Sequence, residues 1–339
     1  MVRGIGAVRF QQIRAYFGDL SLAWEAPGSA FRNAGLPGKV VENLQKLRES
    51  MDLDQVYEAI LAQDISVLTL LDEDYPRLLR EIDQSPPVLY VRGALIPADE
   101  FAVAMVGTRR VSPYGQQITR DTSLYLAGNG LTIVSGLARG VDGLAHQHAL
   151  KAGGRTIAVL GSGVDVIYPP EHRKLAEAIL DNGAIVSDYP LGTQPEGINF
   201  PPRNRIISGL SLATIVVEAG ERSGALITAD FALEQGRDVF AVPGNVLSPA
   251  SRGTNRLIQK GAYAMLSPQD VLDVLDLSQV EAIKTARQVL PTDATEAKIL
   301  KVIGFEPIHV DEVCNQCGLP VEKVSAALTM MELKGMVQH

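Results

Sequence analysis

Between residues 101 and 275 the sequence alternates short apolar runs with segments of helical periodicity, and most apolar runs end in a glycine-containing turn. The runs expected to form strands are residues 101–106, 131–134, 155–160, 184–187, 213–217 and 238–242. Strands that alternate with helices build βαβ units, in which successive strands are parallel and the crossovers are right-handed. The pattern therefore predicts an α/β fold with a mostly parallel sheet, whose glycine-rich turns lie along one edge.

The turns after the first two apolar runs have similar compositions. Gly107-Thr108-Arg109-Arg110 follows the first run, and Ser135-Gly136-Leu137-Ala138-Arg139-Gly140 follows the second. In a parallel sheet both turns open at the carboxyl ends of strands, where α/β folds bind ligands. Small residues let backbone N–H groups approach an anion, and arginine adds a bidentate phosphate donor. The candidate phosphate-binding residues are Gly107, Thr108, Arg109, Arg110, Ser135, Gly136, Arg139 and Gly140.

A further candidate segment spans residues 199–209 and contains Phe200, Arg203, Asn204 and Arg205. Arginines two positions apart reach neighbouring phosphates, an aromatic ring offers a base a stacking face, and asparagine pairs with a phosphate or a base edge. The same residues are equally typical of a rigid helix N-terminus whose arginines pair with Glu218 or Asp188. Both interpretations stay open from the sequence.

Composition limits the class of protein. A hydrophobic content of 46% with 21% charged residues indicates a globular chain, and 339 residues leave room for two or three domains. The sequence has neither a membrane-length apolar run nor a secretory signal, which predicts a cytoplasmic protein without membrane contact. The net charge of −8 disfavours a wholly basic nucleic-acid binder but allows a local basic groove.

The segments that flank this pattern predict further domains. In residues 1–65 two short glycine-rich turns each precede a helical segment, as in a helix-hairpin-helix or SAM-like domain that contacts DNA phosphates or another protein. Residues 66–100 read as connector strands of the main domain at 66–275, and residues 276–294 read as a linker. Helix-like pieces at 296–303, 310–317 and 320–334 and a wing at 335–337 predict a winged helix in residues 295–339. Its last helix balances two lysines with two glutamates, which favours a protein contact over DNA.

Taken together and in order, the motifs resemble those of the DNA-processing protein A family, DprA or Smf. The resemblance covers residues 66–275 and includes the two turns described above. The other matching motifs are Asp74-Tyr75-Pro76, Pro87-Val88-Leu89-Tyr90-Val91-Arg92-Gly93, Phe200-Pro201-Pro202-Arg203-Asn204-Arg205-Ile206-Ile207, Ser223-Gly224-Ala225-Leu226-Ile227-Thr228-Ala229 and Pro243-Gly244. The resemblance implies an extended Rossmann-like domain that binds single-stranded DNA, forms a homodimer and loads RecA during natural transformation, without catalysis, cofactor or metal.

The resemblance also implies a role for each candidate residue. Arg109 and the amides near Gly107 and Thr108 would hold one phosphate. Arg139, near Gly136 and Gly140, would hold another. The opposite wall would comprise Phe200, Arg203, Asn204 and Arg205. The helix that opens at Ser223 and Gly224 would add the positive end of its dipole.

The main alternative is an enzyme that resembles the lysine-decarboxylase-like nucleotide phosphoribohydrolases, which cleave a base from a nucleotide. In that reading Glu218, at a strand end, is the candidate carboxylate beside the ribose. The PGGxGT phosphate loop of those enzymes is absent, because Ser223-Gly224-Ala225 occupies the comparable place.

Other chemistry has weaker support in the sequence. Gly161-Ser162-Gly163 does not extend to a GxGxxG fingerprint, and there is no Gly-Lys-Ser/Thr loop, so no nucleotide cofactor is expected. Cys314 and Cys317 are expected on a buried helix face and not at a zinc site. Asp142 is expected to cap a helix that begins at residue 143.

Overall fold

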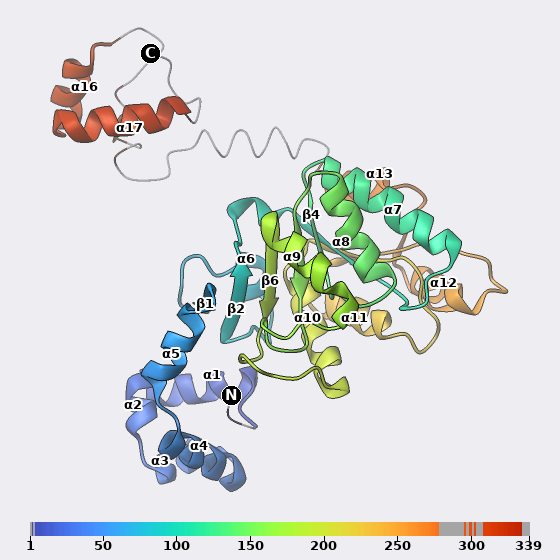
Figure 1. The fold of residues 1–339 in the computed structure, drawn as a ribbon, viewed down its shortest axis with the longest axis horizontal. Coiled ribbons are helices and arrows are strands. Elements are labelled where there is room, and N and C mark those ends of the chain that lie inside the picture. Colours follow the sequence, from blue (N-terminus) through green and yellow to red (C-terminus); the bar gives the residue numbers. More distant parts are fainter. Residues whose placement is uncertain are drawn as a thin grey trace. The chain divides into compact units, whose positions relative to one another are not determined.

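The computed structural model describes residues 2, 4–277, 295, 298–299, 302 and 308–333. The chain divides into two compact units, Met1–Asp276 and Leu277–His339 (Figure 1). Within the described ranges, no helix is both long enough and apolar enough to cross a membrane. The predicted linker at 276–294 lies outside the described residues, except for its first two positions.

A nine-stranded sheet forms the centre of the first unit, in the order β1-β2-β6-β5-β4-β3-β7-β8-β9. Every neighbouring pair from β6 to β9 is parallel, whereas β1 and β2 are antiparallel to each other and β2 is antiparallel to β6. The strands are β1 Ile65–Thr69, β2 Val88–Gly93, β3 Ala102–Val106, β4 Thr132–Ser135, β5 Thr156–Val159, β6 Gly183–Ser187, β7 Ala213–Val216, β8 Asp238–Ala241 and β9 Tyr263–Ala264. The predicted α/β fold with a mostly parallel sheet is confirmed.

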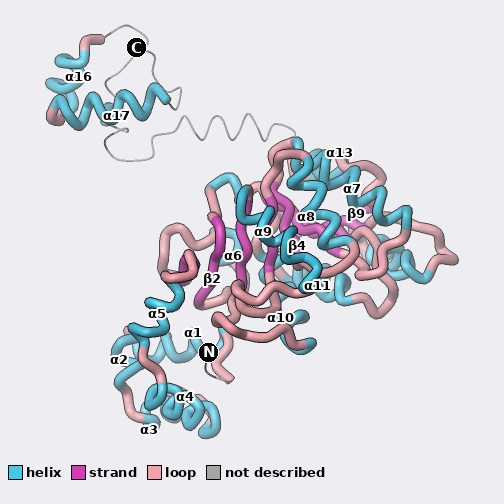
Figure 2. Tube along the Cα trace, viewed as in Figure 1, coloured by secondary structure: helices cyan, strands magenta, loops and turns pink. Residues whose placement is uncertain are grey.

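Helices cover both faces of this sheet, and Figure 2 shows them around the magenta strands. One group consists of α7 Pro113–Gly128, α8 Val141–Lys151 and α9 Arg173–Asp181, which contact one another in succession. The other group consists of α6 Arg77–Arg80, α10 Phe200–Gly209, α11 Gly224–Glu234 and α12 Arg252–Gln259. Every residue of β3 is buried, as expected for a parallel strand that has helices on both sides. The sequence did not predict β9, which has only two residues.

The chain crosses from one half of the sheet to the other between β6 and β7. From β3 to β6 each new strand lies next to the preceding one, on the side toward β2. The chain then returns, and β7 pairs with the opposite side of β3. The long α10 connection makes this return. In open α/β sheets such a reversal of strand order leaves a crevice outside the carboxyl ends of the two strands, here β3 and β7.

Helices precede the sheet in the first unit and form the described part of the second. The N-terminal helices are α1 Ala7–Phe17, α2 Leu20–Glu25, α3 Gly28–Asn33, α4 Gly38–Ser50 and α5 Leu53–Leu61, and the core of this helical segment includes Phe31 and Val41. The second unit contains α16 Val310–Cys317 and α17 Val321–Leu333, which pack around Val313 and Val324. Cys314 is buried in that cluster. The predicted wing lies outside the described residues, as does most of the predicted helix at 296–303.

Candidate functional site

A cavity of about 850 Å³ opens where the strand order reverses, at the carboxyl ends of β3 and β7. The turn after β3 and the first turns of α10 and α11 contribute to its lining. The lining residues include Gly107, Thr108, Arg109, Ala138, Asp142, Tyr168, Phe200, Arg203, Asn204, Arg222, Ser223 and Gly224. The sequence analysis named most of these residues as candidate contacts, and the structure brings those residues to one cavity.

Arg109 and Phe200 form a cation–aromatic contact inside this cavity. The guanidinium carbon of Arg109 lies 5.5 Å from the ring centroid of Phe200. The ring of Tyr168 stacks on Phe200, with 5.8 Å between centroids and 30° between planes. Arg109 is exposed, and no carboxylate pairs with it among the described residues. The cavity therefore presents an available positive charge beside an aromatic pair.

Arg203 also lines the cavity, but its guanidinium is hydrogen-bonded to the protein backbone. The residue is 5% exposed and donates hydrogen bonds to the carbonyl oxygens of Gly136, at 3.1 Å, and Val159. Burial lowers the pKa of Arg203 to about 10, and the nearby Asp142 carboxylate opposes this shift. The guanidinium carbon also lies 5.9 Å from the Phe200 ring, so Arg203 supports the ring from within the wall.

Asp142 does not cap a helix in the expected way. Helix α8 begins at Val141, after Gly140, and Asp142 lies in its first turn. The buried carboxylate accepts a hydrogen bond of 3.1 Å from the Gly136 amide, and burial raises its pKa. The prediction of a cap for a helix beginning at residue 143 was therefore wrong, because the helix starts earlier and the carboxylate turns back toward the loop after β4. The Gly136 amide is thereby committed within the protein.

The glycines of the two turns allow the turns to touch. A Cβ on Gly107 would lie 2.5 Å from Cγ2 of Val141, and a Cβ on Gly140 would lie 2.3 Å from the carbonyl oxygen of Thr108. The backbone of Gly140 has φ of +77°, which favours glycine. The Thr108 amide donates to the carbonyl oxygen of Glu218 at 2.8 Å. The side chain of Arg109 is therefore the group that this turn offers to an anion, in place of the expected Thr108 amide.

Arg139 lies beside the main cavity, on a small recess that it shares with Tyr168 and Phe200. Its guanidinium pairs with Glu171, and both side chains remain about half exposed. The hydrogen bond from Arg139 lowers the pKa of Glu171. Ser135 is buried and donates its hydroxyl to the carbonyl oxygen of Met105 at 2.6 Å. Arg110 is exposed but does not line the cavity.

Arg205 is not brought to the cavity. Its guanidinium forms an ion pair with Asp188 at 2.8 Å, and it also donates to the backbone of Gln84 and Pro202. Of the two interpretations left open from the sequence, Arg205 therefore follows the one in which the arginine pairs with Asp188 within the protein. Asn204 does line the cavity, where its amide nitrogen donates to the Gly224 carbonyl oxygen at 3.3 Å and joins α10 to α11.

The amino end of α11 faces the cavity. The hydroxyl of Ser223 caps the helix by accepting from the Ala225 amide at 3.3 Å. Arg222 is exposed, lines the cavity, and was missed from the sequence together with Tyr168. A local signal was present for Arg222, because it directly precedes the predicted helix start. Tyr168 lies in a loop far along the chain from the other motifs, and only the fold places it against Phe200.

Glu218 has no free carboxylate oxygen to offer a substrate. It is 3% exposed and accepts hydrogen bonds from the amide and hydroxyl of Ser112, at 2.9 and 2.5 Å. Ser112 in turn caps α7 by accepting from the Gly115 amide. Glu218 is not among the lining residues, and Asp142 is the only carboxylate that lines the cavity in the described part of the chain.

Comparison with known proteins gives consistent matches along the chain. The family model for DNA recombination-mediator protein A matches residues 66–276, and the model for the DprA winged helix domain matches residues 284–339. Protein Smf of Synechocystis sp. is 39% identical over 375 residues, covering 100% of this chain and 94% of that protein. DNA processing protein DprA of Streptococcus pneumoniae is 45% identical over 210 residues, covering 62% of this chain and 74% of that protein.

Two solved structures share both fold and sequence with the chain. The X-ray structure of DNA processing protein A from Streptococcus pneumoniae has a TM-score of 0.70 and 37% identity, covering 80% of this chain and 94% of that one. A structure of DNA processing protein A from Helicobacter pylori, which concerns its single-stranded DNA binding mode, has a TM-score of 0.56 and 33% identity. It covers 62% of this chain and 95% of that one.

Proposed function

The chain belongs to the DNA recombination-mediator protein A family, DprA or Smf, and from this premise we propose that it binds single-stranded DNA in the cavity between β3 and β7. The observation that carries the proposal is the contact between Arg109 and Phe200. Arg109 has no carboxylate partner in the part of the chain that the structure describes, and it lies against an aromatic ring in an open cavity. This pair matches the two parts of a single strand, its phosphates and its bases. The Helicobacter pylori relative, with its single-stranded DNA binding mode, supports this assignment.

The phosphate contacts would come from exposed arginines. Arg109 and Arg222 both line the cavity, one in the turn after β3 and the other immediately before α11. The amino end of α11, whose first residues line the cavity, would add the positive end of its dipole. Arg139 would join them once a phosphate displaces Glu171 from its guanidinium. These groups would contact phosphates and not base edges, so the binding would depend little on the base sequence.

A base would stack on the aromatic pair. Tyr168 is 36% exposed and continues the stack that Phe200 begins, while the cations of Arg109 and Arg203 lie near the Phe200 ring. Phe200 is half-buried, so the more open face for a base belongs to Tyr168. The buried Arg203 would act by supporting the ring and the loop after β4, and not by holding a phosphate.

We propose no catalytic role for this cavity. The phosphoribohydrolase alternative needs a carboxylate beside the ribose, and Glu218 has both oxygens engaged by Ser112. Asp142 is buried and bound to the Gly136 amide. From family membership we also propose that the protein acts as a homodimer and loads RecA onto single-stranded DNA during natural transformation.

The decisive experiment compares fluorescent single- and double-stranded oligonucleotides of matched sequence by anisotropy across a salt series. Tight binding of the single strand that weakens steeply with salt would support the proposal, because each neutralised phosphate releases counterions. Absence of single-strand binding at low salt would refute it. Release of free base from a nucleotide, lost in Glu218→Gln, would then support the enzyme alternative.

A further inference from the structure

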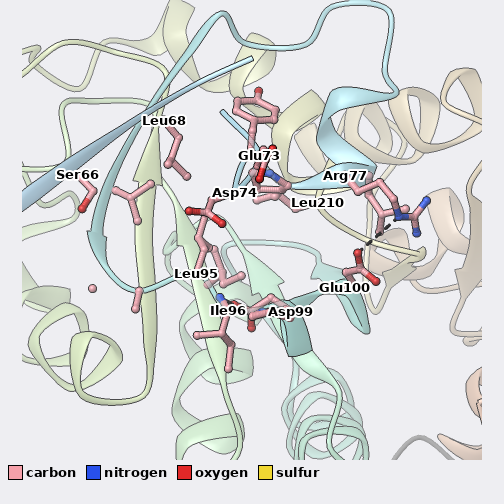
Figure 3. A pocket seen from close by; sticks show the side chains of 18 residues that line it. Ser66, Leu68, Glu73, Asp74, Arg77, Leu95, Ile96, Asp99, Glu100 and Leu210 are labelled. Atoms are coloured by element: carbon pink, nitrogen blue, oxygen red, sulfur yellow. Dashed lines mark hydrogen bonds and ion pairs between the residues drawn. The ribbon is translucent and has the colours of Figure 1, made fainter. Parts of the chain in front are cut away.

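A second cavity lies at the opposite edge of the sheet from the proposed DNA site (Figure 3). It has a volume of about 490 Å³, within the range of ligand sites in proteins. Gly93 and Ala94 line it where antiparallel β2 ends, and the segment that leads into β3 lines another side. These positions belong to the amino-terminal edge of the parallel strands, whereas the DNA cavity opens at their carboxyl ends.

The floor of this cavity is apolar. The sheet contributes Leu68, Val91 and Ile157, and the covering segments contribute Leu95 and Leu210. These side chains belong to the main hydrophobic core or pack against it, so the cavity exposes one end of that core. At its mouth Ile96 is 38% exposed. An occupant that covers this floor must therefore carry apolar surface of its own.

The rim is acidic, and part of its charge is not neutralised. Glu100 pairs with Arg77 at 3.6 Å, and Asp99 pairs with Arg155 at 2.9 Å. Figure 3 shows the Asp74 carboxylate within the ring of lining side chains, whereas Glu100 points along the dashed line toward Arg77. Glu73 and Asp74 have neither an ion pair nor a hydrogen-bond partner for their carboxylates within the described part of the chain. The complementary charge must come from the occupant.

The apolar floor and the acidic rim together favour an organic cation as the occupant of this cavity. No group of three or more metal-ligating side chains converges anywhere in the described ranges, so the carboxylates here do not form a metal cage. Lysine and arginine side chains lay an aliphatic stem on apolar surface and keep a charged end in polar surroundings. We propose that this cavity binds an arginine or lysine side chain of a protein partner, whose apolar neighbours in sequence contact the exposed Ile96 at the mouth. Asp74 would receive the charged end, and Leu68 and Leu95 would receive the stem.

The test uses the full chain and a short peptide, acetyl-Leu-Arg-Leu-amide, titrated by calorimetry and by NMR. Its control is the peptide with citrulline in place of arginine, which keeps the shape and removes the charge. The arginine peptide is expected to bind about tenfold more tightly than the citrulline peptide, because a charge-assisted hydrogen bond is lost. Amide shifts on saturation should centre on Gly93 and Ala94. Absence of saturable binding, or equal binding of the two peptides, would overturn the proposal.

Variants separate this cavity from other acidic surfaces. Asp74→Asn should weaken the arginine peptide about tenfold, whereas Asp83→Asn, which changes an exposed aspartate outside the cavity, should leave its affinity unchanged. Equal affinity for both variants would remove Asp74 from the site. Agmatine, a free guanidinium on an aliphatic stem, tests the source of the cation. Agmatine binding as tight as that of the peptide would overturn the assignment to a protein partner. Asp74→Asn should leave single-strand binding unchanged. The proposal for this cavity can therefore fail without affecting the proposal for the DNA cavity, and the reverse also holds.

Discussion

The guanidinium carbon of Arg109 lies 5.5 Å from the ring centroid of Phe200, although one residue follows β3 and the other begins α10. The reversal of strand order between β3 and β7 produces this contact, because it brings the α10 connection back across the end of β3. The contact joins a cation to an aromatic ring, and the predictions about DNA binding follow from the proposal that these two groups hold a phosphate and a base.

Arg109→Ala should weaken single-strand binding about tenfold at low salt and reduce the salt slope by about one, since it removes one phosphate contact. The matched control is Arg110→Ala, which changes the adjacent exposed arginine that does not line the cavity. Anisotropy titrations at several salt concentrations measure both effects. Equal losses in the two variants would show that general surface charge, and not the cavity, holds the strand.

Tyr168→Ala should cost about 1–3 kcal/mol of single-strand binding, because a stacking face for a base is lost. Tyr168→Phe should bind as the original protein does, because the ring is retained. Tyr125→Ala changes another tyrosine of similar exposure, outside the cavity, and serves as the control. If Tyr168→Phe binds as weakly as Tyr168→Ala, the hydroxyl and not the ring is what matters.

Glu171→Gln should tighten single-strand binding about two- to fivefold, since an exposed ion pair of this kind is worth only about 1 kcal/mol or less. The change frees Arg139 from its carboxylate partner. The gain should disappear when Arg139→Ala is also present, and Glu177→Gln, an exposed glutamate on α9, should show no gain. A gain that persists without Arg139 would mean that Glu171 acts by general repulsion of DNA.

Gly140→Ala should lower the free energy of unfolding by about 3 kcal/mol, since it combines an unfavourable φ with a backbone clash. The added Cβ would lie 2.3 Å from the Thr108 carbonyl oxygen. Gly192 has a similar φ, +75°, but a Cβ added there would meet no atom within 4 Å. Gly192→Ala should therefore lower the free energy of unfolding by only about 1 kcal/mol. Urea unfolding measures the difference. Equal costs would indicate that the two turns separate to accept the methyl group.

Stability should fall as the pH drops below the ordinary pKa of histidine, because of His146. The residue is fully buried, its Nδ1 lies 2.6 Å from the Thr156 hydroxyl oxygen, and its Nε2 has no hydrogen-bond partner among the described residues. Burial lowers the pKa of His146 to about 3, so below the unfolded value of 6.5 the unfolded chain binds the extra proton. The expected loss approaches about 1.4 kcal/mol per pH unit between about pH 6 and pH 5.

Urea unfolding of the original protein and of His146→Asn at these pH values checks this prediction. The variant should be less stable at neutral pH but should lose less stability on acidification. An identical pH dependence in the two proteins would assign the loss to other groups.

The local elements could be predicted from the sequence because they depend on neighbouring residues. The period of the apolar runs indicated the parallel strands, and glycine with hydroxyl residues marked the turns at their ends. The same reasoning placed the turn that carries Arg109 at one edge of the sheet, whereas the place of Phe200 opposite it was implied only by the family resemblance. It also placed Ser223 at the start of a helix, where the structure has it as the N-cap. Helix and strand bounds shifted by only a residue or two in most elements.

Which charged groups remain available was decided by the tertiary structure, because a partner far along the chain can neutralise a side chain. Asp188 takes Arg205 away from the cavity, and the Gly136 and Val159 carbonyl oxygens hold Arg203 within its wall. Ser112 engages the carboxylate of Glu218. Burial and long-range hydrogen bonds thus engage these three side chains. In the described part of the chain, Arg109 lines the cavity without a carboxylate partner, and sequence spacing alone could not show this difference.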